Sequence, residues 1–223
     1  QLLRVCKITE LKSEFISRLS HDLRGPLTSV RMFSEMLQSG QVPSEEKKME
    51  YYRIISSESD KLTHMAYNLL DFSRLEHGRK KYEMRMGDII TLVRETVERF
   101  QSYRPAGESG PRVTLELPNN SIRPFLIDSD AISQALLNIL FNAEKYSPPE
   151  SEIRVAVRKD GKKAVISVID QGIGISEKEQ KEIFKEYYRG TRPEVRSREG
   201  SGLGLTLVRH AVLAHGGRLN VRS

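Results

Sequence analysis

Residues 15–28 have the sequence FISRLSHDLRGPLT. Its apolar residues recur at every third or fourth position, the spacing that places side chains on one face of an α-helix. The pattern continues on both sides of this stretch, so we expect one amphipathic helix over residues 2–39. The apolar stripe consists of Ile8, Leu11, Phe15, Leu19, Leu23, Leu27 and Val30.

A second stripe of the same period follows a short turn. Ser39-Gly40 is a helix stop signal, and Pro43-Ser44 followed by two glutamates is a helix start signal. Two helices of this length joined by a short turn form a helical hairpin, and one hairpin cannot bury both stripes. We therefore expect a homodimer that forms a four-helix bundle. The second stripe consists of Tyr51, Ile54, Ile55, Leu62, Met65, Leu69, Leu70, Phe72 and Leu75, and Gly78 ends it.

From about residue 83 the pattern changes to a mixture of short elements. Helices are expected over residues 89–100, 129–144 (capped by Asp128 or Ser129) and 203–214. Strands are expected over 113–117, 153–157, 164–169 and 218–221, with a hairpin turn at Asp160-Gly161. This order predicts an α+β sandwich, a mixed sheet with helices on one face. We therefore divide the chain into a hairpin domain (1–78), a linker or hinge (79–82) and an α+β domain (83–223).

Composition excludes several classes of protein. The chain has 223 residues and a net charge of +6, but its basic residues are dispersed among acidic ones, so nucleic-acid binding is not expected. The single cysteine, Cys6, excludes an intrachain disulfide and a cysteine metal cluster. No apolar run reaches the roughly 20 residues that span a bilayer. We expect a cytoplasmic fragment of a longer protein, attached to a membrane, if at all, only through missing N-terminal regions.

The first helix carries one candidate nucleophile, His21. At 100° per residue it points away from the apolar stripe, so we expect an exposed imidazole. Asp22 follows directly and is close enough to orient the ring or to take its proton. Pro26 has no N–H, so we expect the helix to bend there. A solvated surface histidine and an incidental kink are the alternative interpretations of these residues.

Four segments of the α+β domain carry residues suited to a nucleotide. Asn138 and Asn142 lie on one face of a helix, where an amide oxygen can bind Mg²⁺, and Lys145 is one turn further on. The other three are DQGIGI (170–175), FKEYYR (184–189) and GSGLGL (200–205), the last of which opens a helix as an anion site does. Residues 190–199 are predicted to form a mobile lid. Each segment alone is also compatible with an ordinary structural role.

Together these motifs resemble the sensor histidine kinases of two-component systems. Residues 15–28 are similar to the H-box of that family, and the four later segments are similar, in order, to its N, G1, F and G2 boxes. The ATPase domain of that family belongs to the gyrase/Hsp90/histidine kinase superfamily. The resemblance covers about residues 8–222, and the domain of the family usually continues through one more strand. The C-terminal strand is therefore expected to be truncated.

The resemblance implies a role for each matching residue. His21 would accept the phosphoryl group from ATP with Asp22 as the base, and would pass it to an aspartate on a response regulator receiver domain. Asn142 would bind Mg²⁺ and Asp170 the adenine amino group. The remaining ATP contacts implied are Asn138, Lys145, Tyr146, Gly172, Gly174, Arg189, Gly200, Gly202 and Gly204.

One position departs from the family pattern. The family usually has Thr or Asn four residues after the histidine, where a polar group assists dephosphorylation of the regulator, and here the residue is Gly25. We therefore expect weak phosphatase activity. Two alternatives to the kinase remain: a clamp-type ATPase of the same superfamily, which the four nucleotide motifs alone do not exclude, and a non-enzymatic signalling dimer.

Overall fold

The structure is a computed structural model that describes residues 2–40, 42–104, 110–118, 122–196, 198 and 200–223. Side chains are described from Lys12 onward, so those of Ile8 and Leu11 lie outside the description. The described residues form two compact units. The hairpin unit comprises those of Gln1–Ser73, Ser102–Glu108 and Glu186–Leu203, and the sheet unit comprises those of Arg74–Gln101, Ser109–Lys185 and Gly204–Ser223.

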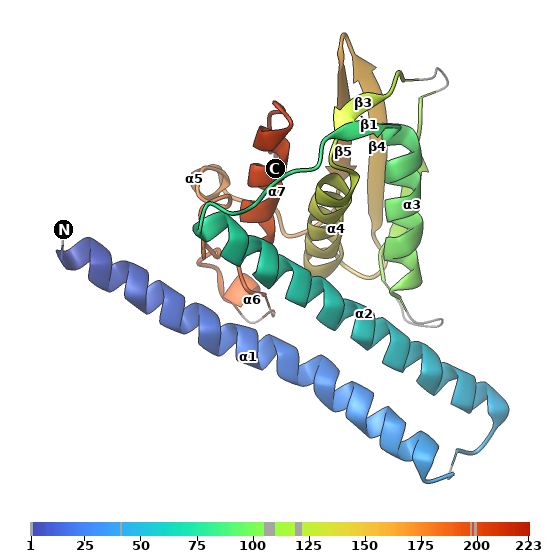
Figure 1. Ribbon diagram of the computed structural model, residues 1–223. Coiled ribbons are helices and arrows are strands. Elements are labelled where there is room, and N and C mark those ends of the chain that lie inside the picture. The colour runs from blue at the N-terminus through green and yellow to red at the C-terminus, as the bar shows by residue number, and fades with distance from the viewer. Residues whose placement is uncertain (1, 41, 105–109, 119–121, 197, 199) are drawn as a thin grey trace. The chain divides into compact units, whose positions relative to one another are not determined.

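Two long helices dominate the hairpin unit, as predicted (Figure 1). α1 spans Leu2–Gln38 and α2 spans Glu45–Glu76. The turn between them uses Gly40 at φ 68°, a left-handed conformation that glycine adopts without steric cost. Ser44 then caps α2, since its Oγ accepts from the Lys47 N–H at 3.3 Å. The Phe33 and Tyr51 rings pack across the hairpin with centroids 4.9 Å apart.

An aromatic cluster joins both helices to a distant part of the chain. Phe15 of α1 and Phe72 of α2 are buried, and the ring of Tyr187 packs on both, at centroid distances of 5.3 and 5.4 Å. Tyr187 has φ 60°, a rare conformation for a residue with a side chain. The short helix α6 (Pro193–Arg196) lies in the same segment. The cluster therefore fastens the chain at Tyr187 to the two helices of the hairpin.

Helix α1 continues without interruption through Pro26. Pro26 is buried, and the Thr28 hydroxyl donates to the Arg24 carbonyl at 2.8 Å in the same turn. Because proline lacks an N–H, it cannot donate the helical hydrogen bond to the carbonyl of Asp22. The ladder of α1 thus lacks one bond in the turn that follows His21.

The sheet unit contains a three-stranded mixed sheet. Its order is β2 (Arg112–Glu116), β4 (Glu152–Asp160), β5 (Lys163–Ile169), with β2 parallel and β5 antiparallel to β4. Gly161 at φ 60° makes the predicted turn between β4 and β5. The inward face of β4 is fully apolar and buried, through Ile153, Val155 and Val157.

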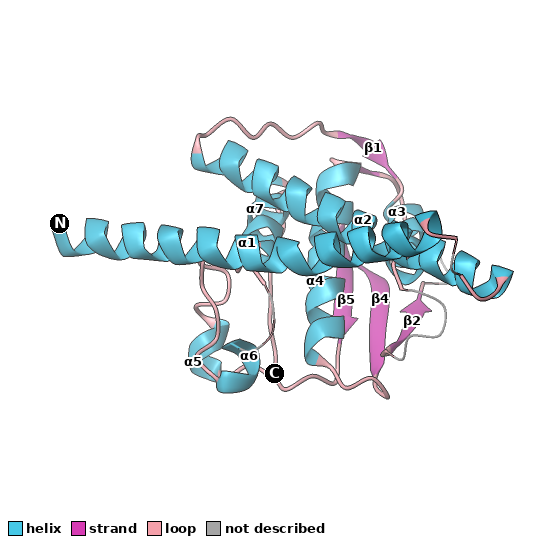
Figure 2. Ribbon diagram, turned by 90° about the horizontal axis from the view of Figure 1, so that it is seen from below, coloured by secondary structure: helices cyan, strands magenta, loops and turns pink. Residues whose placement is uncertain are grey.

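Helices α3 (Ile89–Ser102), α4 (Ser129–Tyr146) and α7 (Gly204–Ala214) complete this unit. α4 packs against β4, β5 and α7, and it lies beside the two strands in both views (Figures 1 and 2). Asp128 is the N-cap of α4, because its Oδ1 accepts from the Ala131 N–H at 2.9 Å. The contact between α4 and α7 is built on small residues, Ala131, Ala135 and Ala211, together with Val208.

Three features differ from the expected element order. Strands β1 (Arg85–Gly87) and β3 (Phe125–Ile127) pair with each other, and α5 (Glu177–Gln180) is a single helical turn. The predicted strand over 218–221 was wrong, since these described residues form no strand. A strand needs a hydrogen-bonded neighbour, and among the described residues β5 pairs only with β4. Within the described chain, no helix has a stretch long and apolar enough to cross a bilayer.

Candidate functional site

His21 and Asp22 lie side by side on α1 with opposite exposure. The His21 side chain is 71% exposed, whereas that of Asp22 is 6% exposed, and Nδ1 of the ring lies 3.9 Å from Oδ1 of the carboxylate. This distance is longer than a hydrogen bond but suits an ion pair. A neutral imidazole with its hydrogen on Nδ1 would direct that hydrogen to Asp22 and keep the lone pair on Nε2. The 71% exposure of the His21 side chain confirms the prediction that its imidazole is exposed.

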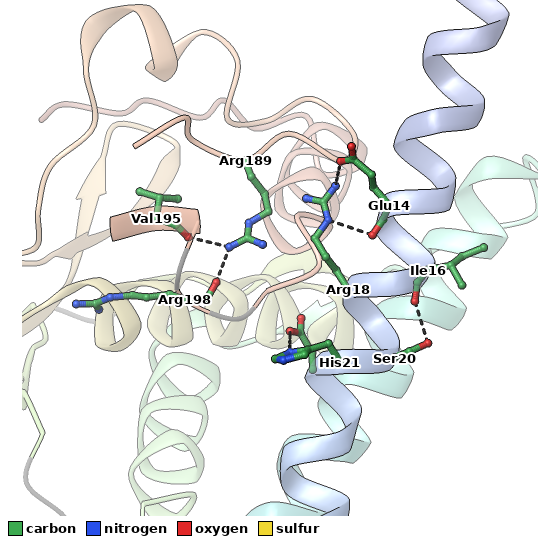
Figure 3. A network of polar contacts seen from close by, with 9 residues as sticks. Glu14, Ile16, Arg18, Ser20, His21, Arg189, Val195 and Arg198 are labelled. Carbon is green, nitrogen blue, oxygen red and sulfur yellow. Dashed lines mark hydrogen bonds and ion pairs between the residues drawn. The ribbon is translucent and has the colours of Figure 1, made fainter. Parts of the chain in front are cut away.

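The turns of α1 before His21 are held by local polar contacts (Figure 3). Arg18 pairs with Glu14 at 2.7 Å, and the Ser20 hydroxyl donates to the Ile16 carbonyl at 2.9 Å. Pairs of this kind on an exposed helix face contribute little stability, about 0.5 kcal/mol or less. Their effect is to keep these side chains along the helix and to leave the His21 ring accessible.

The predicted phosphate-binding Arg189 lies in the hairpin unit and donates to main-chain carbonyls. Its Nη2 donates to Val195 O at 2.7 Å and to Arg198 O (Figure 3). Val195 and Arg198, two described residues of the predicted lid, thus both bond to Arg189 through their carbonyls. At Gly202, which has φ 76°, the backbone comes close to that of Tyr188. A Cβ at Gly202 would lie 3.1 Å from Tyr188 O, so glycine suits this close approach.

The sheet unit brings together the residues predicted from the N box. Asn138 is buried in α4, and Asn142 is half-buried one turn later. The start of α7 fits closely against the first of them, since a Cβ on Gly204 would lie 3.2 Å from Asn138 Oδ1. Farther along α4, the Lys145 ammonium lies over the Tyr146 ring, 5.0 Å from its centroid. The polar face of α4 thus carries two amides and a cation.

The turn after β5 packs onto the end of α4. The Gly172 N–H donates to Asp170 Oδ1 at 2.8 Å, and the Ile173 N–H donates to Tyr146 O at 3.3 Å. A Cβ on Gly172 would lie only 2.7 Å from Asp170 Oδ1 and 3.0 Å from Tyr146 O. The turn therefore requires glycine, and it fixes the exposed Asp170 carboxylate beside Tyr146. The second oxygen of a carboxylate held in this way can accept from an amine.

Gly174 completes this turn at φ 70°, where a Cβ would meet Ser223 Oγ at 3.0 Å. The Ile175 N–H also donates to this hydroxyl at 2.7 Å. The end of the described chain thus supports the back of the turn.

The predicted site residues divide between the two units. The hairpin unit holds His21, Asp22, Arg189, Gly200 and Gly202. The sheet unit holds Asn138, Asn142, Lys145, Tyr146, Asp170, Gly172, Gly174 and Gly204.

Sequence reasoning did not identify His215, which accepts a hydrogen bond from the Asp128 N–H at 2.8 Å. A lone histidine is a weak signal. The two glycines that follow it, Gly216 and Gly217, are the feature that could have drawn attention to it, because they are typical of a helix end.

The residues of α4 fit a magnesium–nucleotide complex better than a metal held by protein alone. Within the described part of the chain, no group of three His, Cys, Asp or Glu side chains could hold a metal ion. Mg²⁺ bound with a nucleotide keeps several waters and takes phosphate oxygens, so it needs few protein ligands. The amide of Asn142, half-buried in α4, satisfies that requirement.

Two family models match this chain. The His Kinase A (phospho-acceptor) domain matches residues 11–78, and the histidine kinase-, DNA gyrase B-, and HSP90-like ATPase matches residues 127–223.

Similar proteins carry both regions. The circadian input-output histidine kinase CikA of Synechococcus elongatus is 33% identical over 95% of this chain, and the alginate biosynthesis sensor protein KinB of Pseudomonas aeruginosa is 33% identical over 96%. The chain spans 28% and 35% of the lengths of these two relatives. In fold, it is similar to the histidine kinase AdeS of Acinetobacter baumannii, with a TM-score of 0.53 at 20% identity over 87% of this chain and 86% of that one.

Proposed function

Because the chain belongs to the sensor histidine kinases of two-component systems, we propose that it phosphorylates His21 from ATP and passes the phosphoryl group to an aspartate of a response regulator. The observation that carries this proposal is the exposed His21 ring with its Nδ1 directed at the buried Asp22 carboxylate. Neither a clamp-type ATPase nor a non-enzymatic signalling dimer requires such a pair.

The pair suits an in-line phosphoryl transfer. The lone pair of His21 Nε2 attacks the γ-phosphorus as the bond to the bridging oxygen breaks, and the electrons of that bond leave on ADP. The imidazole becomes cationic as the N–P bond forms, so the Nδ1 proton moves toward Asp22. The Nδ1–Oδ1 distance of 3.9 Å has to shorten for this transfer.

We assign nucleotide binding to the residues on α4 and on the turn after β5. Asp170 would accept from the exocyclic amine of adenine, with the ring placed by Gly172, Gly174 and Tyr146. The phosphates would meet Asn138, Lys145 and the N-terminal end of α7 at Gly204, since the first turn of a helix directs its N–H groups toward anions. Gly200 and Gly202 would extend this phosphate loop. Asn142 would hold Mg²⁺, which when bound neutralises charge on the phosphate oxygens.

Arg189 now donates through its Nη2 to the lid segment, and a rearrangement of that segment would change its reach toward phosphate. It donates to two carbonyls of the segment 195–198, so its engagement with a nucleotide and the conformation of that segment are coupled. We propose that residues 190–199 act as a lid whose rearrangement releases Arg189 to the phosphates. Residues 197 and 199 lie outside the described chain.

The exposed apolar side chains of the hairpin support the proposal that the chain forms a homodimer. Among the described residues, four large apolar side chains of the hairpin are more than half exposed in the single chain, on both helices: Ile16, Leu27, Tyr67 and Leu70. Apolar side chains exposed along both helices of a hairpin are what a second hairpin would cover. We propose that two chains form a four-helix bundle and that the receiver domain docks on it beside His21. The domain limits predicted above (1–78, 79–82 and 83–223) and the cytoplasmic location stay predictions.

Autophosphorylation is tested by incubating the purified chain with γ-labelled ATP and Mg²⁺, alongside His21→Ala and Asp22→Asn. We expect acid-labile label on the wild type, none on His21→Ala, and label that appears about 100-fold or more slowly on Asp22→Asn, the usual contribution of a general base. ADP affinity should be the same for all three proteins. Label that persists on His21→Ala would refute the assignment.

A further inference from the structure

The C-terminal end of α7 fixes the direction of the His215 side chain. His215 is the last residue before Gly216, which takes the left-handed conformation at φ 64°, and the Gly217 N–H returns to Val212 O at 2.9 Å. Gly217 has no room for a side chain, because a Cβ would lie 2.8 Å from Val212 Cγ1. This helix stop fixes the backbone at His215 and therefore the direction of its ring.

Both ring nitrogens of His215 have partners. Nδ1 lies 2.7 Å from Ala211 O in the same helix, and Nε2 lies 2.8 Å from the backbone N of Asp128. A carbonyl can only accept and a backbone N–H can only donate, so the ring carries its hydrogen on Nδ1 and accepts at Nε2. The geometry thus requires one tautomer of the neutral imidazole.

Asp128 connects His215 to two further segments. Its carboxylate accepts from the Ala131 N–H at 2.9 Å, which caps α4, and from the Glu83 N–H at 2.8 Å. Tyr82 packs its ring edge-on against the His215 ring, with centroids 6.0 Å apart, and the Lys80 ammonium lies over the Tyr82 ring at 5.5 Å. Asp128, Tyr82 and Lys80 are thus titratable groups that lie near His215 in the described part of the chain.

The same two helices meet again at the nucleotide-binding residues. α7 runs antiparallel to α4, since Gly204 at its start lies against Asn138 and His215 at its end lies against Asp128. These contacts are 11 residues apart on α7 and 10 apart on α4, which is about 15 Å of helix on each. Between them the interface is apolar, with three alanines and Val208 at its buried centre and larger aliphatic side chains beside them, so among the described residues this cluster supplies packing but no directional bond. The bond at His215 therefore holds the longitudinal register of α7 on α4.

We propose that His215 is a positioning residue for the nucleotide site: by binding the Asp128 N–H it holds Gly204 in place against Asn138. The proposal rests on the nucleotide-binding function assigned above. It assigns to His215 no contact with the nucleotide. Loss of the acceptor at Nε2 leaves the Asp128 N–H unpaired and lets the start of α7 shift relative to Asn138.

The test measures ADP–Mg²⁺ binding by calorimetry for the 223-residue chain and two variants. His215→Leu removes the acceptor, and His215→Gln places an amide oxygen near the position of Nε2. We expect about 10-fold weaker binding for His215→Leu, and binding within about 3-fold of wild type for His215→Gln. Melting curves confirm that each protein is folded at the assay temperature.

Rescue by His215→Gln and the tautomer of the wild-type ring separate positioning from general stability. Leu and Gln are both uncharged, and only Gln offers an acceptor near the position of Nε2. A difference in affinity between the two folded variants therefore reports the bond to the Asp128 N–H. Nitrogen-15 spectra of the wild type at pH 8 should show the Nδ1–H tautomer.

Three results would overturn the proposal: equal binding by wild type and folded His215→Leu, an equal loss of affinity in folded His215→Leu and folded His215→Gln, or the Nε2–H tautomer. If His215→Leu does not fold, the affinity of His215→Gln and the spectra decide. A wild-type chain that binds no ADP would instead contradict the proposed nucleotide-binding function.

Discussion

Replacing Gly172 by alanine tests whether the turn after β5 is a nucleotide cradle. The added methyl carbon would lie 2.7 Å from Asp170 Oδ1 and 3.0 Å from Tyr146 O. Both distances are below van der Waals contact. Gly172 does not have a positive φ, so alanine suits its backbone and the perturbation is purely steric. The clash can be relieved by moving Asp170 and the turn away from the end of α4, which would break the Ile173 N–H bond to Tyr146 O.

The expected size follows from the cost of overpacking. Inserting a methyl into a closely packed position costs about 1–3 kcal/mol. If the strain is relieved only by displacing the turn, this cost opposes nucleotide binding and raises the dissociation constant about 5- to 150-fold. The melting temperature should change little, because the displaced turn is outside the buried face of β4.

Gly161→Ala provides the matched control. Gly161 has φ 60° and nothing within 4 Å of its would-be Cβ, so alanine there introduces about 1–2 kcal/mol of backbone strain without a clash. We expect Gly161→Ala to lower the melting temperature and to leave ADP–Mg²⁺ affinity, measured by calorimetry, unchanged. Wild-type affinity in Gly172→Ala would refute the cradle. An equal loss in both variants would show that affinity follows general stability.

Three further predictions concern the dimer, stability and the phosphatase reaction. Leu27→Glu should convert a dimer to a monomer in light scattering because it charges an exposed apolar position, whereas Ser34→Glu on the same helix should not. Hydrogen bonds from the Thr91 hydroxyl and the Ile90 N–H hold the pKa of Asp88 below its usual range, so this carboxylate stabilises the fold above that range and the benefit is lost as pH falls. Asp88→Ala should therefore cost about 1 kcal/mol at pH 7 and progressively less toward pH 3, as judged by urea unfolding. Gly25→Thr should accelerate dephosphorylation of a phosphorylated receiver domain, and rapid, equal rates in both proteins would contradict the assignment.

The long helices could be predicted because each carries many repeats of one period. The expected ranges of 2–39 and about 43–78 became Leu2–Gln38 and Glu45–Glu76. The polar turn signals were equally informative, as Asp160-Gly161 shows. The choice between Asp128 and Ser129 as cap required the structure, because either side chain can accept the same N–H groups.

What the sequence left unpredicted depends on partners far along the chain. β1 and β3 have three residues each, too few to show alternation, and each exists only because the other pairs with it. The strand expected over 218–221 alternates well but has no paired neighbour among the described residues. The motifs named Arg189 as a phosphate ligand, yet no local pattern could indicate that it donates to Val195 and Arg198.

The missing hydrogen bond at Pro26 has a consequence for hydrogen exchange. Opening of a helical turn costs less where the ladder lacks a bond, and Gly25 lowers that cost by about a further 1 kcal/mol relative to alanine. Backbone amides just after His21 should therefore exchange with deuterium sooner than those around Phe33, which packs on Tyr51. In a continuous helix of 37 residues, the turns next to His21 would open more readily than the packed turns around Phe33.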